Sequence, residues 1–279
     1  MVDGVCMEIV LDKNSLKKLI YLGNFDDESR ENVCHICFRE KPLTREHVPP
    51  KSAFNNCTGL WDHLAIKKKH GSGRVQFHGG FWVKTLCREC NTSICSTYAR
   101  NYVEFIHSLV AAPVLFDSSG EAKLLRVRGD TLYLAKEIAT MILAVEPLSF
   151  AKHHERLREF VLNRELAIRP DFTVLAFLVP NRPGASTITR YHGRVDTYAP
   201  NHGFMGGEIS GYPFGFVYTN KIGKGYYPEK FTDITQWFSN SGSFERNNSV
   251  MKFYTRITGV DSIQCGLGKP RKRPQIDYY

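Results

Sequence analysis

Three short segments decide the fold of this chain: Cys34-His35-Ile36-Cys37, Glu46-His47-Val48-Pro49-Pro50 and Leu86-Cys87-Arg88-Glu89-Cys90-Asn91. Two residues separate the cysteines of each C-x-x-C pair, so both sulfurs can reach one tetrahedral ion. We therefore expect Cys34, Cys37, Cys87 and Cys90 to bind a structural Zn²⁺. Four thiolates close the shell of such an ion, so other residues must do any chemistry.

The residues left for chemistry in these segments are Glu46, His47 and Asn91. A carboxylate and an amide oxygen are hard ligands that suit Mg²⁺ or Mn²⁺. A neutral imidazole, whose pKa lies near neutrality, can take a proton from an attacking water. Glu-His is a common dipeptide, and what gives it weight here is its place between the two cysteine pairs.

The order of these motifs over residues 33–110 resembles that of the HNH endonucleases of the ββα-metal class, in the subgroup with a cysteine-bound zinc. The resemblance implies that His47 is the general base. It implies that Glu46 and Asn91 hold a catalytic divalent metal, Mg²⁺ or Mn²⁺. The implied reaction is the hydrolysis of phosphodiester bonds, usually in DNA, by an activated water.

One position departs from the family pattern. The middle asparagine of the family commonly stands five residues before the third cysteine, where this chain has Trp82. That asparagine orients the hairpin that carries the base, so another residue is expected to do so. The candidates are Asn55, Asn56, Gln76 and His78.

The charge of +9 and the pI near 9.1 permit a polyanionic partner, which we expect to be DNA, with RNA as an alternative. Basic residues near the motifs are candidates for phosphate contacts, although each also fits an ordinary solvated surface. They are Lys51, Lys67, Lys68, Lys69, Arg74, Lys84 and Arg88.

Four of the eight cysteines lie outside the two pairs, and Cys6, Cys57, Cys95 and Cys265 fit buried thiols. The apolar runs fall short of the about 20 residues that a membrane span needs, and no signal peptide is evident. We therefore expect a cytoplasmic protein with no membrane contact.

The predicted fold class is α+β, in three parts: an N-terminal helix and linker over residues 1–32, a zinc-stapled ββα-metal (HNH) domain over 33–113, and a mixed α+β domain over 114–279. The last part is expected to serve recognition, regulation or oligomerisation, through a second copy or a regulatory partner. N-terminal HNH nucleases with an unfamiliar C-terminal domain resemble bacterial defence effectors, so an antiviral (anti-phage) role is one hypothesis.

Hydrophobic periodicity predicts individual elements. A two-strand hairpin is expected over 75–78 and 81–86, around Gly79-Gly80. The predicted helices are 15–22, 91–111, 131–145 and 152–168, and the predicted strands are 172–179, 186–192, 209–219 and 251–257.

The main alternative is a catalytically silent zinc module that binds nucleic acid or a protein partner. Such a module needs only the four cysteines, so Glu46, His47 and Asn91 distinguish the two hypotheses. Redox chemistry at the C-x-x-C pairs is less favoured, because both pairs fit one metal site.

Overall fold

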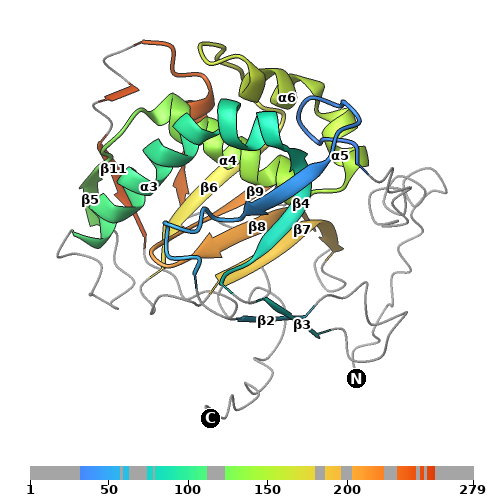
Figure 1. Ribbon diagram of the computed structural model, residues 1–279. Helices are drawn as coiled ribbons and strands as arrows, with labels where there is room; N and C mark the ends of the chain where they lie inside the picture. Colours follow the sequence, from blue (N-terminus) through green and yellow to red (C-terminus); the bar gives the residue numbers. More distant parts are fainter. Residues whose placement is uncertain are drawn as a thin grey trace, which may run out of the picture.

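The computed structural model describes residues 32–56, 59–62, 74–77, 79–111, 123–179, 186–195, 203–222, 231–242, 246–247 and 250–254. They form the mixed helix-and-strand fold that the sequence predicts, with helices over one face of a five-stranded sheet (Figure 1). The predicted helix 15–22 lies outside the described residues.

The central helix is α4 (Thr131–Val145), which spans the predicted residues. The Asp130 carboxylate caps its first turn by accepting the backbone N–H groups of Leu132 and Tyr133. The helix ends at Glu146, whose extended backbone precedes Pro147. Every residue of α4 except Tyr133 is buried, as is typical of a helix that packs on all sides.

The helix predicted over 91–111 begins as a π-helical turn, η1 (Glu89–Ile94), and continues as α3 (Ser96–Val110). Five residues on one face of α3 are buried, as expected for an amphipathic helix: Tyr98, Tyr102, Phe105, Ile106 and Leu109. The ring of Phe105 contacts that of Phe214 in the sheet, with 5.2 Å between the ring centroids.

The helix predicted over 152–168 is only partly correct. The chain forms α5 (Leu148–His153) and α6 (Glu155–Leu162), with a break at His154 and no helix after Leu162. The buried ammonium group of Lys136 explains the end of α6. It donates to the backbone carbonyls of Phe160, Asn163 and Leu166, and so binds carbonyl groups that a longer helix would use itself.

The five-stranded sheet is antiparallel, and its strand order is β10-β6-β9-β8-β7. The strands are β6 (Thr173–Leu178), β7 (Ser186–Val195), β8 (Gly203–Gly211), β9 (Phe214–Ile222) and β10 (Thr232–Asp233). The single strand predicted over 209–219 is wrong, because a tight turn at Tyr212-Pro213 separates β8 from β9. Proline lacks the N–H that an inner strand needs.

Three two-stranded ribbons complete the described fold. They are β1 (Leu43–His47) with β4 (Trp82–Cys87), β2 (Gly59–Asp62) with β3 (Arg74–Phe77), and β5 (Lys123–Arg126) with β11 (Val250–Phe253). The predicted hairpin is therefore wrong in its pairing. Both of its strands exist, but each pairs with an earlier segment of the chain, because Gly79 and Gly80 serve other contacts described below.

One cluster of buried side chains runs from Cys34 to Phe253 and joins the cysteine-rich segment to the sheet. The predicted domain boundary near residue 113 falls in a stretch outside the described residues. The division into domains stays a prediction. A short 3-10 turn, η3 (Thr235–Phe238), adds Trp237 and Phe238 to this core. None of the described helices is long and apolar enough to cross a membrane.

Candidate functional site

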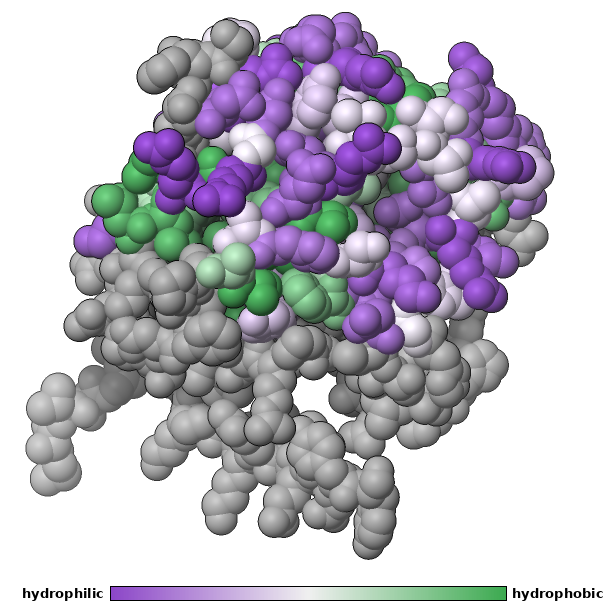
Figure 2. Space-filling model, turned by 60° about the vertical axis from the view of Figure 1, so that its left-hand side comes forward, coloured by the Kyte–Doolittle hydropathy of each residue, from purple (hydrophilic) through white to green (hydrophobic). Residues whose placement is uncertain are grey.

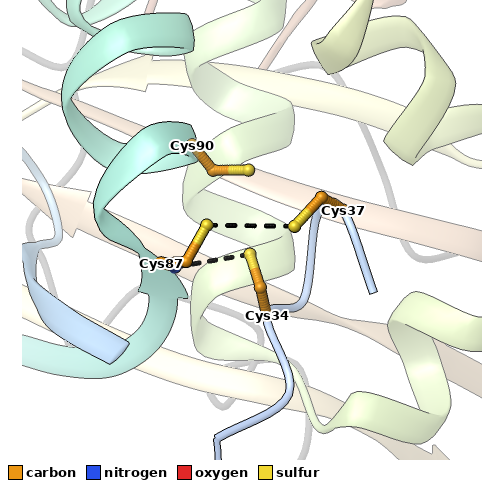
Figure 3. A group of neighbouring side chains, drawn as sticks. All are labelled: Cys34, Cys37, Cys87 and Cys90. Atoms are coloured by element: carbon orange, nitrogen blue, oxygen red, sulfur yellow. Dashed lines mark hydrogen bonds between the residues drawn. The ribbon is translucent and has the colours of Figure 1, made fainter. Parts of the chain in front are cut away.

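The four paired cysteines come together in space, as their spacing predicts. One sulfur from each of Cys34, Cys37, Cys87 and Cys90 lies within 4.8 Å of the other three (Figure 3). The Sγ atoms of Cys37 and Cys87 are 3.8 Å apart. A tetrahedral ion with Zn–S bonds of about 2.3 Å needs sulfurs about 3.8 Å apart, so this set of donors fits a metal ion such as zinc.

Backbone geometry shapes each cysteine pair. Phe38 adopts a positive φ of 56°, and its N–H donates to the carbonyl of Cys34, which turns the first pair back on itself. The second pair joins the end of β4 to η1. The N–H of Cys87 points at Cys34 Sγ at 3.4 Å, a contact that stabilises a thiolate (Figure 3).

Proton affinities within the cluster are shifted in opposite directions. The Cys90 thiol donates to Cys34, and together with backbone N–H groups this lowers the pKa of Cys34 to about 4, against the opposing effect of burial. The same pairing raises the pKa of Cys90. One thiolate is thus already favoured before any metal binds, and a bound cation would favour the others.

The cysteine cluster is fastened to the central helices. His35 Nδ1 lies 2.9 Å from the carbonyl oxygen of Leu143, and the Thr85 hydroxyl donates to the carbonyl of Ala144, so α4 holds both cysteine segments. Arg158 of α6 lies over the ring of Phe38, with Cζ 4.0 Å from the ring centroid. These contacts make the cluster part of the main core rather than a separate appendage.

Asn91 links η1 to the strand that carries Glu46 and His47. Its side-chain Nδ2 donates to Thr44 Oγ1 and to the carbonyl of Arg45, each at 3.0 Å. Thr44 and Glu46 share one face of β1, since residues two apart on a strand point the same way. The structure therefore brings Asn91 against the Glu46 face of the strand, and no hydrogen bond engages its Oδ1 within the described residues.

Glu46 is half-buried, and burial raises the pKa of its carboxyl group to about 7. A cation beside this carboxylate would replace the lost water as a partner of the charge and would lower the pKa again.

His47 stands at the end of β1, directly opposite Trp82. Burial lowers the pKa of its imidazole, and the positive charges of Lys51 and Arg45 lower it further, whereas a hydrogen bond with the backbone of Gly79 raises it. The net effect favours the neutral ring. The bond to Gly79 occupies one ring nitrogen and leaves the other to accept a proton.

Asn55 fixes the end of the β1–β4 pair at which His47 stands. This pair of strands is called the β1–β4 hairpin below. Its Nδ2 donates to the carbonyls of Pro49 at 2.7 Å and Phe81 at 2.9 Å, and its Oδ1 accepts the N–H of Phe81 at 2.8 Å. Of the four candidates for the missing asparagine, Asn55 thus joins the loop after β1 to the start of β4. Asn56 is exposed, His78 lies outside the described residues, and Gln76 is described only in its backbone.

Gly80 makes the Asn55 contact possible. It has a φ of +99°, and a Cβ built on it would lie 1.9 Å from the backbone oxygen of Asn55. Gly80 therefore allows the close approach of two backbones, whereas a Cβ on Gly79 would meet nothing within 4 Å.

Sequence reasoning missed Glu137. It is completely buried in α4, and neither of its carboxylate oxygens has a hydrogen-bond partner among the described residues. Burial raises its pKa, and the charge of Glu46 raises it further, so the two carboxyl groups interact. The sequence signal for Glu137 is the pair of charged residues Lys136-Glu137 within a largely apolar helix.

The predicted phosphate-contacting residues are only partly described. Lys51, Lys84 and Arg88 are exposed. Lys67, Lys68 and Lys69 lie outside the described residues, and Arg74 is described only in its backbone. Of the unpaired cysteines, Cys95 is buried as predicted, while Cys6, Cys57 and Cys265 lie outside the described residues.

Comparison with known proteins adds no relative: no protein-family model, no curated protein and no solved structure matches this chain.

Proposed function

We propose that this protein is a metal-dependent endonuclease of the HNH type that hydrolyses phosphodiester bonds in DNA. The observation that carries the proposal is the pair of hydrogen bonds from Asn91 to Thr44 and Arg45. They hold the first turn after the second cysteine pair against the strand that bears Glu46 and His47. The resemblance implies such an arrangement of two strands and a helix, in which the Glu46 carboxylate and the Asn91 amide serve one metal ion.

In this proposal the four cysteines keep a structural zinc, and Glu46 and Asn91 hold the catalytic Mg²⁺ or Mn²⁺. The bound cation would neutralise phosphate charge and stabilise the leaving oxygen. The free carboxamide oxygen of Asn91 suits this role, because the Nδ2 of the same group is already used to grip the strand.

His47 would act as the general base. Its ring is kept neutral at physiological pH by burial and by neighbouring positive charges, and the Gly79 hydrogen bond fixes its orientation. A water held beside the free ring nitrogen would lose a proton to it while attacking phosphorus. Cleavage should therefore rise with pH through a lowered histidine pKa and then level off.

The test is cleavage of supercoiled plasmid by purified protein with Mg²⁺, with Mn²⁺ and with EDTA. Wild-type protein should nick or linearise the plasmid only with a divalent metal. The variant His47→Ala should lose cleavage by on the order of 10²–10⁴-fold, while its zinc content and circular dichroism stay unchanged. His153→Ala, which removes an exposed histidine of α5, is the matched control.

The rival hypothesis, a silent zinc module, makes the opposite prediction. Such a protein would bind zinc and would not cleave under any of these conditions. Equal cleavage by wild type and His47→Ala would remove His47 from the mechanism.

A further inference from the structure

Arg45 lies over the ring of Trp82, next to His47. The guanidinium Cζ of Arg45 lies 4.4 Å from the centroid of the Trp82 ring. Arg45 and His47 are two residues apart on β1, and Trp82 is the direct partner of His47 on β4, so all three side chains share one face of the hairpin. The irregularity in this pairing lies between Thr44 and Glu46 and places the extra residue on β4, so β1 keeps its alternation.

The guanidinium group of Arg45 has no acidic partner within the described part of the chain. The described ion pairs use other cations: Lys41 with Glu89, His154 with Asp171, Arg158 with Glu155, and Arg246 with Asp130 and Glu165. Arg45 is exposed, and its charge acts on the imidazole of His47. A cation therefore lies over an aromatic ring beside the proposed base, and no described residue accepts a hydrogen bond from its N–H groups.

A stacked guanidinium is a suitable phosphate ligand. The ring restricts the motion of the side chain and covers one face of the guanidinium plane, while the N–H groups at the edge of that plane can form two parallel hydrogen bonds with phosphate oxygens. Less conformational entropy is then lost on binding than for a mobile surface lysine.

We infer that Arg45, held on Trp82, binds the nonbridging oxygens of the phosphate that His47 addresses. The inference rests on the proposed function and gives a role to the departure at position 82. Asn55 clamps the hairpin, and this leaves position 82 to carry a platform for a phosphate-binding arginine.

The test compares Arg45→Ala, Arg45→Lys and Trp82→Leu with wild type in plasmid cleavage and in melting temperature. Arg45→Ala should lower kcat/KM by on the order of 10- to 100-fold, as expected for the loss of charge-assisted hydrogen bonds. The kcat/KM of Arg45→Lys should lie between those of wild type and Arg45→Ala, because lysine keeps the charge but lacks the planar guanidinium group. Arg126→Ala, at an exposed arginine of β5, should cleave like wild type.

A double-mutant cycle tests the platform. If Trp82 acts by holding Arg45, the double variant Arg45→Ala/Trp82→Leu should lose no more activity than Arg45→Ala alone. Fully additive losses would show that Trp82 does not act through Arg45.

DNA binding separates a failure of this inference from a failure of the proposed function. Anisotropy of a labelled duplex is measured with His47→Ala and with His47→Ala/Arg45→Ala over a range of salt. The second variant should bind less tightly, and the slope of log affinity against log salt should fall by about one. Equal affinity and equal slope would overturn the phosphate contact, whether or not the wild type cleaves DNA.

Discussion

The two ends of the β1–β4 hairpin are held by different means. At the Leu43–Cys87 end, four cysteine sulfurs gather within 4.8 Å of one another, and three of the four cysteines are buried. At the His47–Trp82 end, one amide side chain, that of Asn55, makes three hydrogen bonds to backbone atoms on both sides of the opening.

The cysteine end of the hairpin is built for rigidity, whereas the Asn55 end leaves side chains accessible. A closed set of sulfur ligands gives a rigid anchor but leaves no group free for a substrate. The Asn55 clamp uses only backbone partners, so His47 and Arg45 remain available on the outer face. The following experiments test this contrast between the Leu43–Cys87 end (the anchored end) and the His47–Trp82 end (the open end).

At the anchored end, Cys87→Ser should abolish zinc binding and with it the fold. The free energy of structural zinc binding, on the order of 10 kcal/mol, is comparable to the stability of a whole domain. Zinc content by plasma mass spectrometry and thermal melting by circular dichroism measure the two effects. Cys95→Ala, which removes a buried cysteine outside the cluster, should keep its zinc. A folded, zinc-free Cys87→Ser protein would refute the anchor.

At the open end, His47→Ala should leave melting nearly unchanged and should stop cleavage. The expected loss of on the order of 10²–10⁴-fold is that of a general base.

Asn91→Ala should instead raise the concentration of Mg²⁺ or Mn²⁺ needed for half-maximal rate. A metal dependence that Asn91→Ala does not change would argue against Asn91 as a ligand.

Within the buried helix α4, Glu137→Gln should change how stability depends on pH. The raised pKa means that folded Glu137 keeps a proton that the unfolded chain releases above about 4.5, so its contribution is complete at low pH and is lost as pH rises. Above that point wild type should lose about 1.4 kcal/mol per pH unit relative to the variant, up to the folded pKa. Urea unfolding between pH 5 and pH 8 measures this, with Glu104→Gln, at an exposed glutamate of α3, as control. Parallel pH profiles would show that Glu137 does not titrate.

The smallest effect is expected for Asn55→Ala. Loss of the clamp should reduce the free energy of unfolding by about 1–3 kcal/mol, because backbone groups of Pro49 and Phe81 lose their partner. Cleavage should also decrease, since His47 would lose its fixed position. Asn163→Ala, at an exposed asparagine, is the matched control. A rate loss without a stability loss would indicate that Asn55 touches substrate.

The sequence predicts the anchored end far better than the open end. Ligand spacing within a C-x-x-C pair is a local property, and so is the apolar pattern of α4. The partners of Asn55 are backbone atoms up to 26 residues away, and no residue type identifies them in advance. The predicted pairing of 75–78 with 81–86 is wrong for the same reason, since the observed partners β1 and β4 are separated by more than thirty residues of sequence.

Two other features differ from the prediction for different reasons. The turn at Tyr212-Pro213 has a local signal, the proline, inside an otherwise apolar run. The charged pair Lys136-Glu137 marks an unusual position in α4, but the complete burial of Glu137 depends on tertiary packing, because helix periodicity gives the orientation of a residue and not the thickness of the layers around it. The proposed function, by contrast, rests on a motif resemblance and on the packing of Asn91 against β1.

The close approach of Gly80 to Asn55 has an evolutionary consequence. A Cβ at position 80 would lie 1.9 Å from the backbone oxygen of Asn55 and 2.6 Å from its Oδ1, so glycine is required at position 80 wherever this close approach is kept. Any descendant of the same ancestor that keeps this asparagine clamp must also keep the glycine. A search pattern that joins Asn55 and Gly80 to the two cysteine pairs would therefore exclude the many unrelated zinc knuckles that share only the cysteines.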